Sequence, residues 1–257
     1  MIRVERQGDV LVVTLNRPER LNAAPPQMFD EIRAAVSALD GARAVLLAGE
    51  GRAFCSGADV ASGALSAATD PGEMTFKALT AHYNPAMLAI AELDVPVVSA
   101  VRGPAAGIGC SLALAADFCV VAPSAYFLQA FVNIGLAPDG GASWSLPRLI
   151  GKARATEMMM LGERVSGEKA VEWGMAHRLV AEDALEAEAL ALATRLAAGP
   201  TRALGAMRRN MMAALESDYG AAMWREAEAQ REMRGTYDAQ EGGMAFLQKR
   251  KAEFKGR

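Results

Sequence analysis

Two glycine-containing stretches decide the fold of this chain: FCSGAD at residues 54–59 and GPAAGIG at residues 103–109. Each follows a short apolar run, Ala44 to Ala48 before the first and Val97 to Val101 before the second. Such runs predict buried strands, so both glycine turns are expected at the carboxyl ends of strands. Glycine permits backbone conformations that aim peptide N–H groups into a cavity. Together the two turns could therefore hold an oxyanion.

The segments around these turns alternate between strand and helix patterns. Val10 to Leu15 predicts a buried strand, and Pro26 opens a helical pattern. Residues 74–93 and 109–116 predict helices, and Phe118 to Val121 predicts a further strand. Because strands and helices alternate along the first two-thirds of the chain, we expect an α/β core with parallel strand pairing.

The texture changes beyond about Lys152, where Ala, Leu, Met, Glu and Arg dominate. This composition predicts a mostly helical last third, with Ser166 and Thr201 as N-caps and Gly174 as a C-terminal stop. The methionines at 207–212 could form a binding surface, but methionine at helical spacing is more typical of a core or a subunit interface.

Composition excludes several classes of function. The chain has 257 residues with 27 basic and 30 acidic side chains, so no strong net charge recruits nucleic acid or an anionic membrane. Its three cysteines are an odd number in apolar or glycine-rich surroundings, which indicates a reduced, cytoplasmic protein. No signal peptide or transmembrane segment is expected, since the apolar stretch at 105–122 is interrupted by Asp117 and several glycines. A small-molecule ligand is the expected partner.

Two further sites are disfavoured by spacing. Gly107 and Gly109 lack the third glycine of a dinucleotide fingerprint, because Leu112 stands there. His82 and His177 have no partner at metal-ligand spacing, so no metal is expected. Residues 61–71 are rich in Ala, Ser, Thr and Gly, which is typical of a mobile surface loop that could lie over a pocket.

Five motifs, in order and approximate spacing, resemble the crotonase (enoyl-CoA hydratase/isomerase) superfamily over nearly the whole chain. They are NRPERLNA at 16–23, FCSGAD at 54–59, AVRG at 100–103, PDGG at 138–141 and EGGMAFLQKR at 241–250. The resemblance implies a spiral of strand–strand–helix repeats over residues 1–195, which holds the CoA-ester pocket. It also implies a helical region at 196–257 that packs subunits into a homotrimer or a dimer of trimers and closes the pocket. An acyl-CoA is then the substrate, and no separate cofactor is implied.

The resemblance also assigns roles to individual residues. The backbone N–H groups of Ala58 and Ile108 are the expected oxyanion donors, and losing one such donor typically raises a barrier by about 3–4 kcal/mol. Asp139 is the expected base. The expected substrate-binding residues are Ala23, Ser56, Gly57, Asp59, Tyr83, Asn84, Gly107, Ser111 and Phe131.

The reaction depends on what stands in place of two glutamates. Family hydratases use a pair of them to add water, and this sequence has Ser111 and Phe131 at those positions. A hydroxyl and a phenyl ring cannot position water and pass its protons. Family isomerases instead place an acid in the loop of Asp139, where one carboxylate can move a proton between two carbons. Taken without the family, Asp139 is better interpreted as a helix N-cap, which is a common role of aspartate at helix starts.

We therefore expect an acyl-CoA isomerase. Residues 130–144 and HYNP at 82–85 look most like the epoxyphenylacetyl-CoA isomerase branch of phenylacetate degradation. Phe131 would then form an apolar wall for a ring or unsaturated chain, or else belong to the core. Cys55 and Cys110 could be reactive, although buried thiols are commoner.

Four other functions stay open. They are enoyl-CoA hydratase, an aryl-CoA dehalogenase (a branch with tryptophan where Phe131 stands), a hydrolase using Ser111, and a CoA-ester-binding paralogue without turnover.

Overall fold

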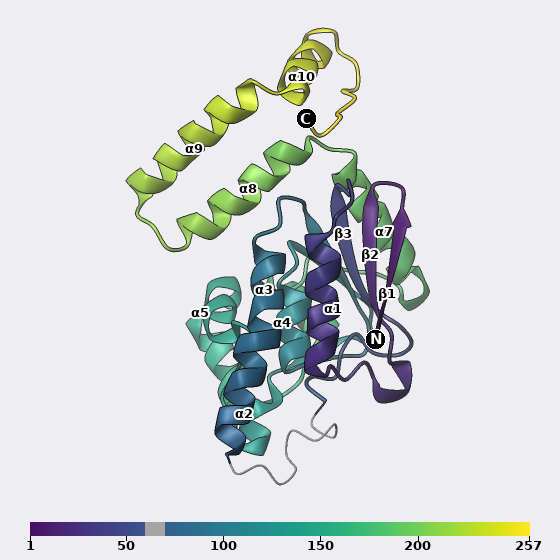
Figure 1. Cartoon of the computed structure of the whole chain (residues 1–257), viewed down its shortest axis with the longest axis vertical. Coiled ribbons are helices and arrows are strands. Elements are labelled where there is room, and N and C mark those ends of the chain that lie inside the picture. Colours follow the sequence, from purple (N-terminus) through teal and green to yellow (C-terminus); the bar gives the residue numbers. More distant parts are fainter. Residues whose placement is uncertain (60–69) are drawn as a thin grey trace.

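The computed structural model describes residues 1–59 and 70–257, and its centre is a sheet flanked by helices (Figure 1). In spatial order the strands of this sheet are β1 (Ile2–Gln7), β2 (Val10–Leu15), β3 (Ala44–Gly49), β4 (Val97–Val101), β6 (Phe118–Val121) and β9 (Arg178–Leu179). Strand β1 is antiparallel to β2, and every other pair of neighbours is parallel. The predicted α/β core with parallel pairing is thus confirmed.

A smaller sheet lies beside the first. Its strands are β5 (Pro104–Ala106), β7 (Tyr126–Leu128) and β8 (Val165–Ser166). Strand β4 leads to β5 and then to helix α4 (Ile108–Leu114), and β6 leads to β7 and then to a 3₁₀ helix (Ala130–Ile134). This order is the strand–strand–helix spiral expected from the resemblance. Strands this short are too brief to show an alternation of polar and apolar residues. Pro104–Ala106, predicted as part of a glycine turn, is therefore a strand that the sequence did not indicate.

The residues of β2 alternate between two buried clusters. Leu11 and Val13 face helices α1 (Pro26–Ser37), α3 (Asn84–Ala91) and α4, whereas Val10 and Val12 face helix α7 (Leu185–Ala197). The sheet is therefore covered on both faces, which is the arrangement that parallel sheets require (Figure 1).

The helix predicted over residues 74–93 is continuous but contains an irregular turn. Helix α2 (Pro71–Ala78) begins with Asp70, whose carboxylate accepts the Glu73 N–H at 3.0 Å. A π-helical turn (Leu79–Tyr83) separates α2 from α3. Such turns insert one residue into a helix and are frequent at functional sites.

The last third is mostly helical, as predicted. It comprises α5 (Ala142–Leu161), α6 (Gly167–Glu172), α7, α8 (Thr201–Ala214), α9 (Tyr219–Arg234) and α10 (Tyr237–Leu247). Two further 3₁₀ helices span Pro18–Arg20 and Glu182–Ala184. Within the described residues, no helix is both long and apolar enough to span a membrane.

Two of the three predicted helix boundaries are confirmed. The Ser166 hydroxyl accepts the Lys169 N–H at 3.3 Å, and Gly174 follows α6 with a φ of 74°. The N-cap predicted at Thr201 is wrong, because Pro200 occupies the cap and Thr201 is the first helical residue. The Thr201 hydroxyl instead accepts a hydrogen bond from Nε of Arg43 at 2.8 Å.

Helices α8, α9 and α10 form an annex that projects from the body, and the C-terminal tail returns from it (Figure 1). The buried Asp238 carboxylate accepts the N–H groups of Lys255 at 2.7 Å and Gly256 at 2.8 Å. Arg43 donates to the carbonyl of Phe254 at 3.3 Å. The division expected after residue 195 falls in the last turn of α7 and stays a prediction.

Candidate active site

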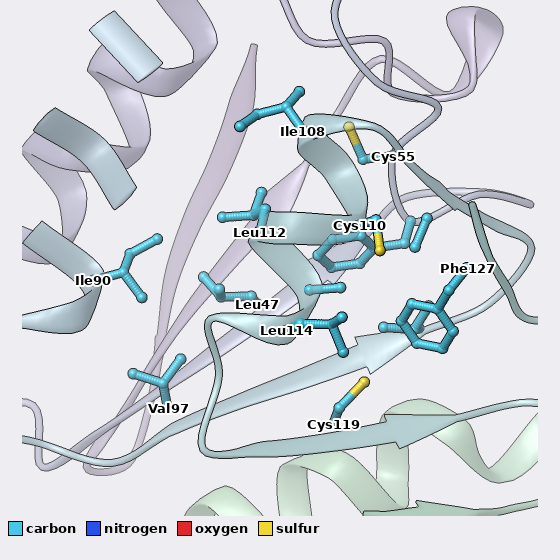
Figure 2. Packing of buried hydrophobic residues seen from close by; sticks show 14 of the residues in the cluster. Leu47, Cys55, Ile90, Val97, Ile108, Cys110, Leu112, Leu114, Cys119 and Phe127 are labelled. Carbon is cyan, nitrogen blue, oxygen red and sulfur yellow. The ribbon is translucent and has the colours of Figure 1, made fainter. Parts of the chain in front are cut away.

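The two glycine turns lie side by side. Cys55 pairs with Ala105, since its N–H donates to the Pro104 carbonyl and its carbonyl accepts the Ala106 N–H, each at 2.9 Å. A Cβ on Gly109 would lie 2.7 Å from Cβ of Cys55, so only glycine fits there. Figure 2 shows the close approach of Cys55 to the first turn of α4.

Gly57 and Gly107 bring the turns still closer. Their φ angles are +108° and +52°, a region that side-chain-bearing residues rarely adopt. A Cβ on Gly107 would lie 3.9 Å from Cα of Gly57 and 3.5 Å from Cζ of Phe131. Phe131 is partly exposed and therefore lies against the junction of the turns instead of belonging to the core.

The two predicted oxyanion donors flank this junction. Ala24 donates its N–H to the Gly57 carbonyl at 2.8 Å and accepts the Asp59 N–H at 3.1 Å. Because this pairing uses the residues on either side of Ala58, the N–H of Ala58 points away from Ala24. Ile108 is the first residue of α4, and its N–H has no acceptor within the helix. In the described part of the chain, neither amide has a protein acceptor.

The loop that carries Asp139 lies on the first turn of α4. The Ser111 hydroxyl donates to the Asp139 carbonyl oxygen at 3.2 Å. A Cβ on Gly140 would stand 2.4 Å from Cδ1 of Ile108 and 2.8 Å from Cβ of Ser111. Asp139 is therefore fixed, through its own backbone and that of Gly140, next to the turn that presents the Ile108 N–H.

The Asp139 carboxylate does not cap a helix. Gly141 occupies the N-cap of α5 with a φ of 82°, and no side chain caps that end. The Oδ1 atom of Asp139 is buried and has no hydrogen-bond partner among the described residues. Burial raises the pKa of Asp139 to about 6. A buried acid with an unused oxygen and a pKa near neutrality has the properties of a general base, so the N-cap interpretation is wrong.

Tyr83 and Asn84 follow one another but do not share a role. The Tyr83 hydroxyl donates to the Ala24 carbonyl at 2.9 Å, and its ring packs 4.7 Å from that of Phe29. Burial, with a smaller contribution from the negative charge of Asp139, raises the pKa of Tyr83. Asn84 is exposed, and no contact in the described part joins it to the other predicted residues. Substrate binding by either residue stays a prediction.

Ala23, Ser56 and Asp59 lie at the base of the first turn. The buried Asp59 carboxylate pairs with Arg17 at 2.9 Å and Arg20 at 3.9 Å. The Ala23 carbonyl also accepts from Arg17, and the Ser56 hydroxyl lies 3.5 Å from the Arg20 carbonyl. These contacts tie the NRPERLNA segment to the turn at 54–59. Substrate binding by Ala23, Ser56 and Asp59 stays a prediction.

The thiols near the site are not activated. Cys55 and Cys110 are buried, and burial raises their pKa values to about 11 and about 12. Both are therefore neutral at physiological pH and fit the buried interpretation. Within residues 1–59 and 70–257, no group of three His, Cys, Asp or Glu side chains is placed to bind a metal.

Sequence reasoning missed two contributors to this geometry. Ala24 acts through its backbone carbonyl, which no side-chain pattern could reveal. Gly140 was part of a quoted motif, but its close contact with α4 needed coordinates. The mobile loop predicted at 61–71 lies mostly outside the described residues.

Known proteins resemble this chain over nearly its whole length. The model of the Enoyl-CoA hydratase/isomerase family matches residues 5–257. A Rhodobacter capsulatus protein named "Probable enoyl-CoA hydratase" is 41% identical over 100% of this chain and 98% of its own length. The Escherichia coli 1,2-epoxyphenylacetyl-CoA isomerase is 38% identical, over 96% of this chain and 95% of its own length. A solved Mycobacterium abscessus structure, described as an enoyl-CoA hydratase/isomerase, superposes with a TM-score of 0.94 at 36% identity, covering 100% of both chains.

The fold and the paired glycine turns define an enzyme of the crotonase class. The chain belongs to the enoyl-CoA hydratase/isomerase family. Relatives with hydratase and isomerase names match it to similar degrees, so the choice between the two reactions depends on the site.

Proposed function

We propose that this protein is an acyl-CoA isomerase that shifts a double bond, or isomerises a ring epoxide, in an enoyl- or arylacetyl-CoA. One observation carries the proposal: Asp139 places a buried carboxylate oxygen, unpartnered in the described part, beside the turn that presents the Ile108 N–H. The positions of the two hydratase glutamates hold Ser111 and Phe131, which leaves Asp139 as the acid of the site.

In the double-bond shift, the thioester oxygen accepts hydrogen bonds from the Ala58 and Ile108 N–H groups. The Asp139 carboxylate removes a proton from one carbon of the acyl chain, and the C–H electron pair is delocalised as a dienolate. The protonated Asp139 then returns that proton to a different carbon. The proton stays within the enzyme and substrate, so the step consumes no water and no co-substrate. Phe131 would line the acyl chain and exclude water from the carbanion.

Hydration is the second candidate, favoured by the name of the Rhodobacter capsulatus relative. It needs a group that positions water, and the Ser111 hydroxyl is already directed to the Asp139 carbonyl. A serine hydrolase has less support. His82 is hydrogen-bonded to Asp30 at 2.7 Å, and the ring of His177 packs 5.0 Å from Phe118. Neither histidine contacts Ser111.

We also propose that the protein assembles as a homotrimer or dimer of trimers through its annex. Large apolar side chains on α8, α9 and α10 are exposed in the single chain, and such patches mark interfaces. They include Met207, Met211, Met212, Leu215, Tyr219, Met223, Trp224, Phe246 and Leu247. Light scattering on the purified protein should give a mass three or six times that of one chain, whereas a monomer would contradict this assembly.

The reaction is tested by incubating the protein with enoyl-, dienoyl- and arylacetyl-CoA esters, followed by mass spectrometry and ultraviolet absorbance. Isomerisation changes the absorbance without changing the mass, hydration adds the mass of water, and hydrolysis releases free CoA. We expect isomerisation that is lost in Asp139→Asn. The matched control is Asp218→Asn, which makes the same change at the cap of α9, where asparagine also serves. Full activity in Asp139→Asn would refute the assigned base.

A further inference from the structure

The Ala24 carbonyl oxygen accepts two hydrogen bonds, and one comes from a side chain. Asp59 donates its N–H at 3.1 Å, and Tyr83 donates its hydroxyl at 2.9 Å. With the Ala24 N–H on the Gly57 carbonyl, this network fixes both residues that flank Ala58. The direction of the Ala58 N–H therefore depends on where Ala24 lies.

Tyr83 is itself held by two consecutive contacts between the π-helical turn and α1. His82 Nδ1 lies 2.7 Å from Oδ2 of Asp30, and the Tyr83 ring packs 4.7 Å from the ring of Phe29. Tyr83 is only 6% exposed, so its hydroxyl has little freedom to choose another acceptor. Tyr83 is the last residue of the π-helical turn, a kind of turn that is frequent at functional sites.

We infer that Tyr83 is a positioning residue of the active site, whose hydroxyl fixes the Ala24 carbonyl and thereby aims the Ala58 N–H at the substrate oxygen. The inference rests on the proposed function, because it assigns the Ala58 N–H to the oxyanion. It replaces direct substrate binding as the role of Tyr83. An oxyanion donor is effective only when it is aimed before the charge develops, so a small loss of aim lowers the rate more than it weakens binding.

The chemistry of Tyr83 suits a permanent hydrogen-bond donor. Burial and the nearby Asp139 charge raise its pKa, so the phenol keeps its proton over the pH range in which enzymes of this kind are assayed. The bond to Ala24 therefore persists when Asp139 changes its protonation state.

The first test is Tyr83→Phe in the full-length protein. This substitution keeps the ring against Phe29 and deletes only the hydroxyl. We expect kcat for isomerisation to fall by about 10- to 100-fold while KM changes by less than about 3-fold. The matched control is Ser99→Ala, because the Ser99 hydroxyl is also buried and donates to a backbone carbonyl, that of Ala113, at 2.8 Å. Ser99→Ala should lower the melting temperature by a similar amount and leave kcat within about 2-fold.

The second test reads the oxyanion contact directly. A CoA thioester labelled with ¹³C at the carbonyl is bound to Asp139→Asn, which prevents turnover, and the carbonyl stretch is measured by difference infrared spectroscopy. Adding Tyr83→Phe should move the stretch to higher frequency, since a less well-aimed N–H polarises the carbonyl less. Adding Ser99→Ala should leave the stretch unchanged.

The outcomes separate this inference from the proposed function. An active wild-type isomerase in which Tyr83→Phe changes neither kcat nor the stretch overturns the role of Tyr83 and leaves the function intact. A rise in KM alone shows that the hydroxyl contacts substrate, which also overturns it. If the wild-type protein binds thioesters without isomerising them, the function fails, but the infrared shift still tests Tyr83. Failure to bind any thioester overturns both.

Discussion

The side chain of Ser111 is hydrogen-bonded to the backbone of Asp139, with 3.2 Å between the hydroxyl oxygen and the carbonyl oxygen. The residue at the position of a hydratase glutamate thus supports the loop that carries the proposed isomerase base. The side chain of Ser111 and the placement of Asp139 are thus parts of the same local structure.

The pH dependence of activity should report Asp139. Its pKa is raised to about 6 by burial, and the base must be ionised to accept a proton. We expect kcat/KM to be constant above about pH 7 and to fall tenfold per pH unit well below pH 6. A stopped assay between pH 4.5 and 8.5 measures this. A profile that stays flat down to pH 4.5 would exclude Asp139 as the base.

Ionised Asp139, which the reaction requires, should lower the stability of the fold. The folded-state pKa of about 6 exceeds the ordinary aspartate pKa of 3.8, so ionisation is harder in the folded state. The resulting penalty begins above the unfolded pKa and is complete above the folded one. We expect Asp139→Asn to raise the free energy of unfolding by about 1–2 kcal/mol at pH 8, with little effect at pH 4. Urea unfolding at both pH values checks this, and an equal change at both would contradict it.

Restoring a glutamate at the first hydratase position should not create a hydratase. Ser111 lies so close to Gly140 that a Cβ built on Gly140 would be 2.8 Å from Cβ of Ser111. The longer side chain of Ser111→Glu therefore has little room beside Gly140. We expect the loop of Asp139 to be displaced and isomerisation to fall at least about tenfold, without a gain in hydration of crotonyl-CoA. Ser111→Ala should keep activity within a few-fold and cost about 1 kcal/mol of stability. Efficient hydration by Ser111→Glu would show that the second acid is Asp139.

Gly140 should tolerate no side chain. Its φ is +60°, and a Cβ would meet Cδ1 of Ile108 at 2.4 Å. We expect Gly140→Ala to destabilise the fold by about 2–4 kcal/mol and to lower kcat by moving the base. The control is Gly135→Ala, since Gly135 has a similar φ of +72° but nothing within 4 Å of its Cβ position. That variant should lose only about 1 kcal/mol, as measured by thermal unfolding. Equal losses in the two variants would mean that backbone strain alone explains the effect.

Most long elements could be predicted from the sequence. Each has either a regular spacing of apolar residues or a residue, such as Pro26, that marks one of its ends. Strand β2 spans the predicted Val10–Leu15, and helix α1 begins at the predicted Pro26. Sequence reasoning missed the six-residue β1 and the two- or three-residue strands β5, β7, β8 and β9, of which the short ones are specified by partners elsewhere in the chain.

The sequence named the candidate site residues, but it did not reveal the long-range contacts with backbone carbonyls that hold them. The residue types at 111, 131 and 139, on which the proposed isomerisation rests, can be read without coordinates. The Tyr83 hydroxyl donates to the carbonyl oxygen of Ala24, 59 positions earlier in the chain. An alanine side chain gives no indication that its backbone carbonyl accepts this bond. Thr201 shows the same limit, because its expected cap gave way to a contact with Arg43, which lies 158 positions away in the chain.

The returning C-terminal tail affects the order in which contacts of the fold can form during synthesis on the ribosome. The sheet and α7 are formed by residues up to Ala197, and α8 joins them through buried Arg208, which pairs with Asp117 at 2.7 Å and donates to the Ile90 carbonyl at 3.2 Å. Arg43 can donate to the Phe254 carbonyl only after the residues that follow α10 have been synthesised. The same holds for the hydrogen bonds that Asp238 accepts from the Lys255 and Gly256 N–H groups. The contacts that hold the tail to Arg43 and Asp238 therefore form only once residues 254–256 have been synthesised.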